Sequence, residues 1–159
     1  MYIDKYWGNY IGGTDDSLTL LDYLAAKQKA RIPLSEIFAD TGLDRHDWDF
    51  RKTLPDLSYC DGDGIEYPFY YAIDLVTDLA ALMLECQVNG SVYLGELGGD
   101  SGYDVRITFT DREKAAMNKA LADFAGDPLA YDLHEMVPGE DMLEMARDCE
   151  ALRKELCEV

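Results

Sequence analysis

The chain has 159 residues, of which 48% are apolar and 29% charged, and this composition and length predict one globular domain spanning residues 1–159. Its 32 Asp and Glu residues outnumber the 14 Lys and Arg residues, so the formal net charge is -18. A negative field of this size opposes the approach of phosphates and argues against nucleic acids and anionic membranes as direct ligands. The same field favours a basic protein partner.

The four cysteines are expected to be reduced thiols. Cys60, Cys86, Cys149 and Cys157 form no C-x-x-C pair and show no zinc-like spacing with the two histidines, so we expect no metal and no other cofactor. The N-terminus lacks an apolar run of signal-peptide length, and the longest apolar segment is too short to span a bilayer. A cytoplasmic location is therefore expected.

Aromatic residues and three glycines in residues 2–13 predict a short strand or an ordered arm that ends in a turn. Thr14 supplies an N-cap, and apolar spacing then predicts a helix through about Lys29. A shorter helix is predicted after Ser35, ending at Gly42. Residues 44–64 should be mostly loop, with a brief strand near residues 57–60.

A central helix is predicted after Pro68, ending at Asn89–Gly90, because its apolar residues recur at helical spacing. In that pattern Asp74, Asp78 and Glu85 are assigned to the remaining, polar face. The next segment predicts a hairpin at about 91–110, with a glycine-rich turn and a second strand in which apolar and polar residues alternate.

Two more helices complete the prediction. Thr110 and Glu113 form a capping box that opens one of them, and the other follows Pro138–Gly139. An apolar seam from Met142 to Leu156 is only two heptads long, which favours docking on the same domain and predicts a monomer or weak homodimer. The expected fold class is α+β, with about four to five helices around a small antiparallel sheet that includes the hairpin at about 91–110.

The strongest functional signal is an acidic middle third. Between Thr53 and Val105 there is no Lys or Arg, while ten carboxylates occur. This stretch is either a solvated face or a recognition surface, and tyrosines beside the acids suit recognition because they bring large contact area at low entropy cost. The candidate partner-binding residues are Asp61, Asp63, Glu66, Tyr67, Tyr71, Asp100 and Asp104.

Three motifs suggest catalysis or metal binding but are incomplete. Residues 99–102 read G-D-S-G, yet the chain is too short for the serine-protease fold that this motif serves. Residues 61–66 offer three carboxylates but lack the rest of a calcium loop. His46 precedes Asp47 without the second His-Asp set of a metal phosphohydrolase and is expected to face solvent. We predict no catalytic residues.

The N-terminal segments WGNYIGG (residues 7–13) and DDSLTLL (residues 15–21) resemble the opening of bacterial immunity proteins from polymorphic-toxin and contact-dependent growth inhibition systems. The resemblance implies a non-enzymatic inhibitor that binds and silences a cognate protein toxin. The alternatives are a small metal-dependent hydrolase or metal-binding regulator using residues 61–66 with His46, and an adaptor domain whose partner is not a toxin.

Overall fold

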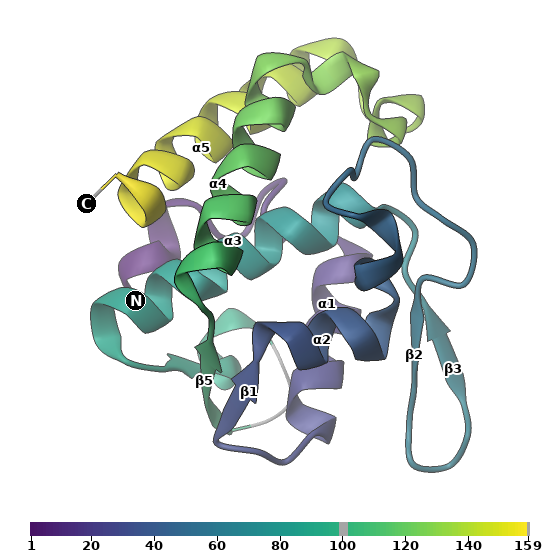
Figure 1. The fold of residues 1–159 in the computed structure, drawn as a ribbon, viewed down its shortest axis with the longest axis vertical. Helices are drawn as coiled ribbons and strands as arrows, with labels where there is room; N and C mark the ends of the chain where they lie inside the picture. Colours follow the sequence, from purple (N-terminus) through teal and green to yellow (C-terminus); the bar gives the residue numbers. More distant parts are fainter. Residues whose placement is uncertain (99–101, 159) are drawn as a thin grey trace.

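The computed structural model describes residues 1–98 and 102–158, which form an α+β fold as predicted (Figure 1). The α-helices are α1 (Asp15–Ala26), α2 (Leu34–Thr41), α3 (Ala72–Asn89), α4 (Asp111–Gly126) and α5 (Gly139–Cys157). The strands are β1 (Arg31–Pro33), β2 (Ser58–Cys60), β3 (Glu66–Pro68), β4 (Val92–Tyr93) and β5 (Asp104–Thr108). Short 3-10 helices are η1 (Tyr2–Lys5), η2 (Leu43–His46), η3 (Leu94–Leu97), η4 (Pro128–Ala130) and η5 (Asp132–Glu135).

Helix boundaries follow the predicted caps. The Thr14 side chain accepts a hydrogen bond from the Ser17 amide at 3.2 Å and starts α1. Thr110 and Glu113 form the predicted capping box at the start of α4. Gly42 and Gly90 end α2 and α3 with φ angles of 90° and 88°, a backbone conformation that glycine adopts without strain.

The three-stranded sheet has the order β1-β5-β4 and is mixed. Strand β4 pairs with β5 antiparallel, but this pairing is only two residues long because the chain turns into η3 after Tyr93. Strand β1 pairs with β5 in parallel. The prediction missed β1 because this strand is only three residues long and ends at Pro33. A proline at this point indicates an interruption of regular structure. The predicted turn at 98–102 lies largely outside the described residues.

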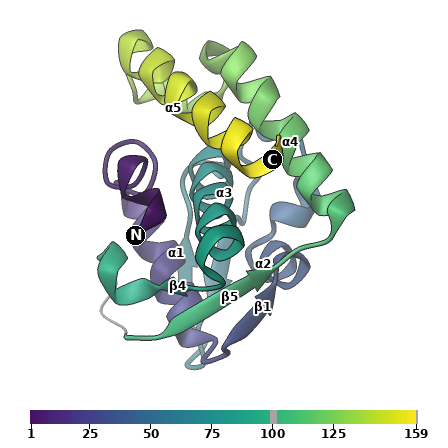
Figure 2. The same ribbon diagram turned by 90° about the vertical axis from the view of Figure 1, so that its left-hand side faces the viewer.

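Helix α3 lies between the sheet and the α4–α5 pair (Figure 2). Every residue from Ala72 to Cys86 is buried, so this part of the helix has no solvent-facing side. The assignment of Asp74, Asp78 and Glu85 to a wet face was therefore wrong. The reason is that neighbouring segments cover this part of α3 on all sides, and a helix in such surroundings must satisfy its polar side chains inside the protein.

Helix α5 docks on the same chain, as predicted. It packs against α4 and α3, and its apolar seam is fully buried there: Met142, Met145, Cys149, Leu152 and Leu156. This seam is thus occupied within the chain. None of the helices in the described residues combines the length and apolar character needed to cross a bilayer.

The N-terminal segment forms an arm rather than a strand. It begins with η1 and continues through a turn to Thr14. Lys5 pairs with Glu155 of α5 at 2.8 Å, and the hydroxyls of Tyr2 and Tyr6 donate to the same carboxylate. The two chain ends therefore lie on the same side of the molecule (Figure 1).

Candidate functional site

Three carboxyl groups form an acid row along α3: Asp74, Asp78 and Glu85. Spacings of four and seven residues place them on one helix face, and the N-terminal arm covers two of them. Asp78, 0% exposed, accepts hydrogen bonds from the Gly12 amide at 2.7 Å and the Ser17 hydroxyl at 2.6 Å. Glu85 accepts from the Ile3 amide at 3.1 Å and from the Asn89 side chain.

Asp74 is the member of the row that lacks such donors. Its side chain is 3% exposed, and its buried Oδ1 has no hydrogen-bond partner among the described residues. Burial raises the pKa of Asp74 to about 8, and the negative charges of Asp78, Asp16 and Asp132 add to this effect. The pKa of Asp78 is likewise raised by burial, to about 7, although its two hydrogen bonds oppose the shift.

Asp74 lines a groove of about 360 Å³ that we call the Asp74 groove. Three segments distant in sequence build it: the start of α1, the approach to α3, and the chain from η5 towards α5. The lining residues are Thr14, Asp15, Asp16, Tyr70, Tyr71, Asp74, Leu133, Met136 and Val137. Apolar and aromatic walls thus surround a carboxyl group, and no lining residue is basic.

Asp16 joins two of these segments. It is buried, and its carboxylate accepts hydrogen bonds from the Tyr70 amide at 3.0 Å and the Tyr71 amide at 3.0 Å. These bonds fix the backbone that carries both tyrosines into α3. Burial raises the pKa of Asp16, while the two backbone N–H groups act in the opposite direction. Asp16 therefore has a structural role, and Asp74 is left as the buried acid of the groove whose Oδ1 has no donor among the described residues.

Four of the predicted partner-binding residues lie on the antiparallel β2–β3 hairpin: Asp61, Asp63, Glu66 and Tyr67. Asp61 Oδ1 accepts from the Asp63 and Ile65 amides, both at 2.9 Å, and its Oδ2 accepts from the Tyr67 hydroxyl at 3.1 Å. These N–H groups lower the pKa of Asp61. Asp63 and Glu66 are exposed.

The seven predicted partner-binding residues do not share one place in the fold. Tyr71 lines the Asp74 groove, whereas Asp104 begins β5, and Figure 1 shows β5 well apart from the hairpin with α1 and α2 between them. Asp100 lies outside the described residues. The prediction also missed Asp74 and Met136 as groove residues. The one sequence signal for Asp74 was an acid row on an otherwise apolar helix.

The predicted solvent-facing His46 is instead buried. Its ring packs on Phe50, with ring centroids 5.6 Å apart, and its Nε2 accepts a hydrogen bond from the Leu54 amide at 3.1 Å. Burial lowers the pKa of His46. Among residues 1–98 and 102–158, no three His, Cys, Asp or Glu side chains are grouped to hold a metal ion. All four cysteines are free, as expected.

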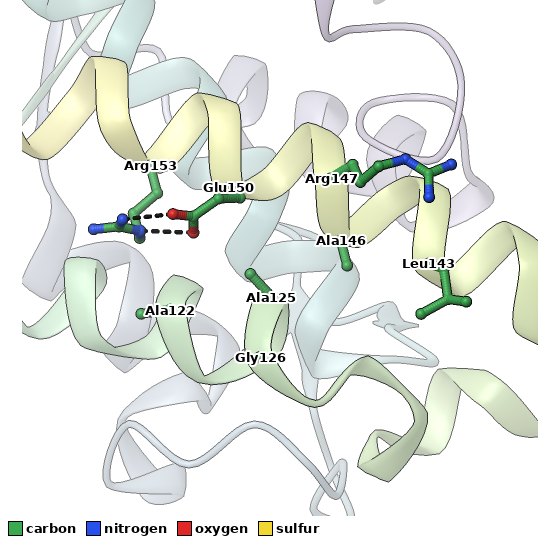
Figure 3. A pocket seen from close by; sticks show the side chains of 8 residues that line it. All are labelled: Ala122, Ala125, Gly126, Leu143, Ala146, Arg147, Glu150 and Arg153. Atoms are coloured by element: carbon green, nitrogen blue, oxygen red, sulfur yellow. Dashed lines mark hydrogen bonds and ion pairs between the residues drawn. The ribbon is translucent and has the colours of Figure 1, made fainter.

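A second groove, of about 570 Å³, runs between α4 and α5 (Figure 3). Its floor is made of small residues, including Ala122, Ala125 and Ala146. Arg153 lies at one end, and its guanidinium pairs with Glu150 at 2.6 Å. This groove has apolar walls like those of the Asp74 groove, but the charged pair beside it is already satisfied within α5.

The described residues thus form an α+β fold with an acid row buried along α3. A family model described as Immunity protein 68 matches residues 2–156, and the chain belongs to that family. The immunity-protein resemblance of the N-terminal segments is thereby confirmed and extends along nearly the whole chain. Neither the curated proteins nor the solved structures contain a significant match.

Proposed function

We propose that this protein binds a cognate toxin domain and neutralises it through its acidic surface, acting in the cytoplasm by binding rather than by catalysis. The observation that carries the proposal is the immunity-family match over residues 2–156, because an immunity protein implies a toxin partner. The net charge of -18 supports a basic toxin surface as the counterpart.

The arrangement of ion pairs supports the electrostatic part of the proposal. Lys27 pairs with both Glu36 and Asp40, each at 2.8 Å. Some of the 14 basic side chains are therefore already neutralised within the protein. No ion pair in the described part of the chain involves the carboxylates of the β2–β3 hairpin. The hairpin thus projects unneutralised negative charge, which would speed the encounter with a basic partner.

We propose that the protein acts as a monomer towards its toxin. The seam on α5 that could have served a homodimer is buried against α3 and α4. The whole acidic exterior then remains available to one toxin domain.

The proposal is tested by co-expression with the protein encoded immediately upstream, scored by growth rescue and by isolation of a complex. Rescue together with a stable one-to-one complex is the expected result. Growth arrest despite normal expression of the folded immunity protein, with no complex, would contradict the proposal. Binding should weaken as salt is raised, because exposed charges are screened within about 8 Å at physiological ionic strength.

A further inference from the structure

In the described part of the chain, two of the three acids in the acid row on α3 accept hydrogen bonds from neighbouring segments, and the third does not. Asp78 and Glu85 each receive donors from the N-terminal arm, whereas Asp74 Oδ1 is buried with no donor from the described residues. A buried carboxyl oxygen without a hydrogen bond is costly, and such an atom in a native structure calls for a partner. Asp74 is the member of the row that lines the Asp74 groove.

The walls of the groove define the chemistry of that partner. Leu133, Met136 and Val137 offer apolar contact, and the rings of Tyr70 and Tyr71 stand on the approach to α3. Lysine and arginine combine a methylene stem, which packs on apolar surface, with a cationic head that aromatic faces attract. Asp15 is exposed where α1 begins and adds negative charge to the lining, while no cation competes there.

We propose that the Asp74 groove receives one lysine or arginine side chain of the toxin, with its cationic head pairing with the Asp74 carboxyl group. This inference rests on the proposed function and names the place where the toxin is anchored. The exposed positions of Tyr70 and Met136, 62% and 72% exposed, would become buried in the complex.

Binding of a cation at this position would change the ionisation of Asp74. Burial and the negative charges of Asp78 on α3, Asp16 on α1 and Asp132 on η5 favour the protonated form of Asp74 in the free protein, and Asp15 of α1 also lines the groove. A bound ammonium or guanidinium favours the carboxylate, so complex formation releases a proton. Affinity for the toxin should therefore rise as the pH is raised from 6.5 to 8.0.

The experiment measures binding of a catalytically inactive form of the upstream-encoded toxin at pH 6.5 and 8.0. Asp74→Asn removes the acid while keeping nearly the same shape, and Asp123→Asn makes the same charge change at an exposed position on α4. We expect Asp74→Asn to weaken binding by about 30-fold at pH 8.0, mainly through faster dissociation, and to abolish the rise of affinity with pH. Asp123→Asn should retain both the affinity and its pH dependence.

A second pair of variants avoids any change in the buried acid. Met136→Arg places a cation on an exposed lining position, where it can occupy the groove and exclude the toxin side chain. Val88→Arg introduces the same cation at an exposed position far from the groove. Val88 lies at the other end of α3, about 21 Å along the helix axis from Asp74. We expect Met136→Arg to weaken binding by about tenfold and Val88→Arg to leave it unchanged.

The outcomes separate the two proposals. If the wild-type protein binds the toxin but Asp74→Asn and Met136→Arg bind equally well, the groove is not the anchor and only this inference is overturned. If the wild-type protein binds no toxin and rescues no growth, the proposed function itself is wrong, and the anchoring role is overturned with it.

Discussion

The β2–β3 hairpin and the Asp74 groove hold the same kind of residue in opposite surroundings. On the hairpin, Asp61 accepts three hydrogen bonds from its own turn, and the backbone N–H groups lower its pKa. In the groove, Asp74 is buried without a partner for Oδ1, and its pKa is raised to about 8. The hairpin acids are therefore suited to long-range attraction, and Asp74 to a single close contact.

The largest expected effect concerns the neighbour of Asp74 in the acid row. Asp78→Ala would leave the Gly12 amide and the Ser17 hydroxyl buried without an acceptor, and we expect it to lower the free energy of unfolding by about 3 kcal/mol. Urea unfolding followed by circular dichroism measures this loss. Asp78→Asn keeps one acceptor and should lose less. Equal stability of Asp78→Ala and the wild type would show that the arm does not depend on the row.

The next effect is a fall in stability as pH rises. Folded Asp74 keeps its proton up to about pH 8, whereas the unfolded residue loses it near its ordinary pKa of 3.8, so stability contributed by protonation is lost as pH rises through this interval. Between pH 6.5 and 8.0 the contribution of Asp74 amounts to up to about 2 kcal/mol. Thermal melts should show a lower Tm at pH 8.0.

Asp78, with a pKa of about 7, adds to the same fall in the wild-type protein. The control is therefore Asp74→Asn, in which the Asp78 contribution remains and the slope becomes shallower. His46 contributes equally to the slope in the wild type and in Asp74→Asn, because burial lowers its pKa in both folded proteins. A slope unaffected by Asp74→Asn would mean that Asp74 is ionised in the free protein.

Removing a carboxylate from the β2–β3 hairpin should lower the stability of the protein far less than removing Asp78 does. Asp61→Ala removes three hydrogen bonds from an exposed turn where water can replace them, and we expect Tm to fall by about 3 °C. Asp61→Asn retains a side-chain carbonyl and should fall less. A loss as large as that of Asp78→Ala would contradict the contrast between the two regions.

The smallest effect is kinetic. The double variant Asp63→Asn with Glu66→Gln should slow association with the toxin by about threefold at low salt and leave dissociation unchanged, because both residues are exposed and act at a distance. Stopped-flow mixing measures both rates. In 1 M salt, where the screening length is about 3 Å, the difference should vanish. A change in dissociation rate would place the hairpin in the bound interface.

Much of the helical structure could be predicted from local sequence. Thr14, Thr110 and Gly90 act through their own turns, so their patterns identify helix ends without tertiary information. Strand β1 could not be found in this way. It is short, and its pairing depends on β5, whose residues lie more than seventy positions later in the chain.

The candidate site was less predictable, for two physical reasons. Asp16, Tyr71 and Met136 meet only in the folded chain, so no local pattern joins them. The helical pattern also assigned Asp74 to solvent, because acids on an amphipathic helix usually face water. Only the packing of the N-terminal arm over α3 reveals that this face is interior. The role of the hairpin and groove residues in toxin binding stays a prediction.

The contacts of the N-terminal arm also determine how early the arm can fold during synthesis. Lys5 pairs with a residue 150 positions later, and Ile3 with one 82 positions later. The contact between the arm and α5 can therefore form only after α5 has been synthesised, whereas the contacts of the arm with α3 can form much earlier. A chain interrupted before α5 would leave Lys5 without its partner and would expose the part of α3 that α5 covers, which favours aggregation.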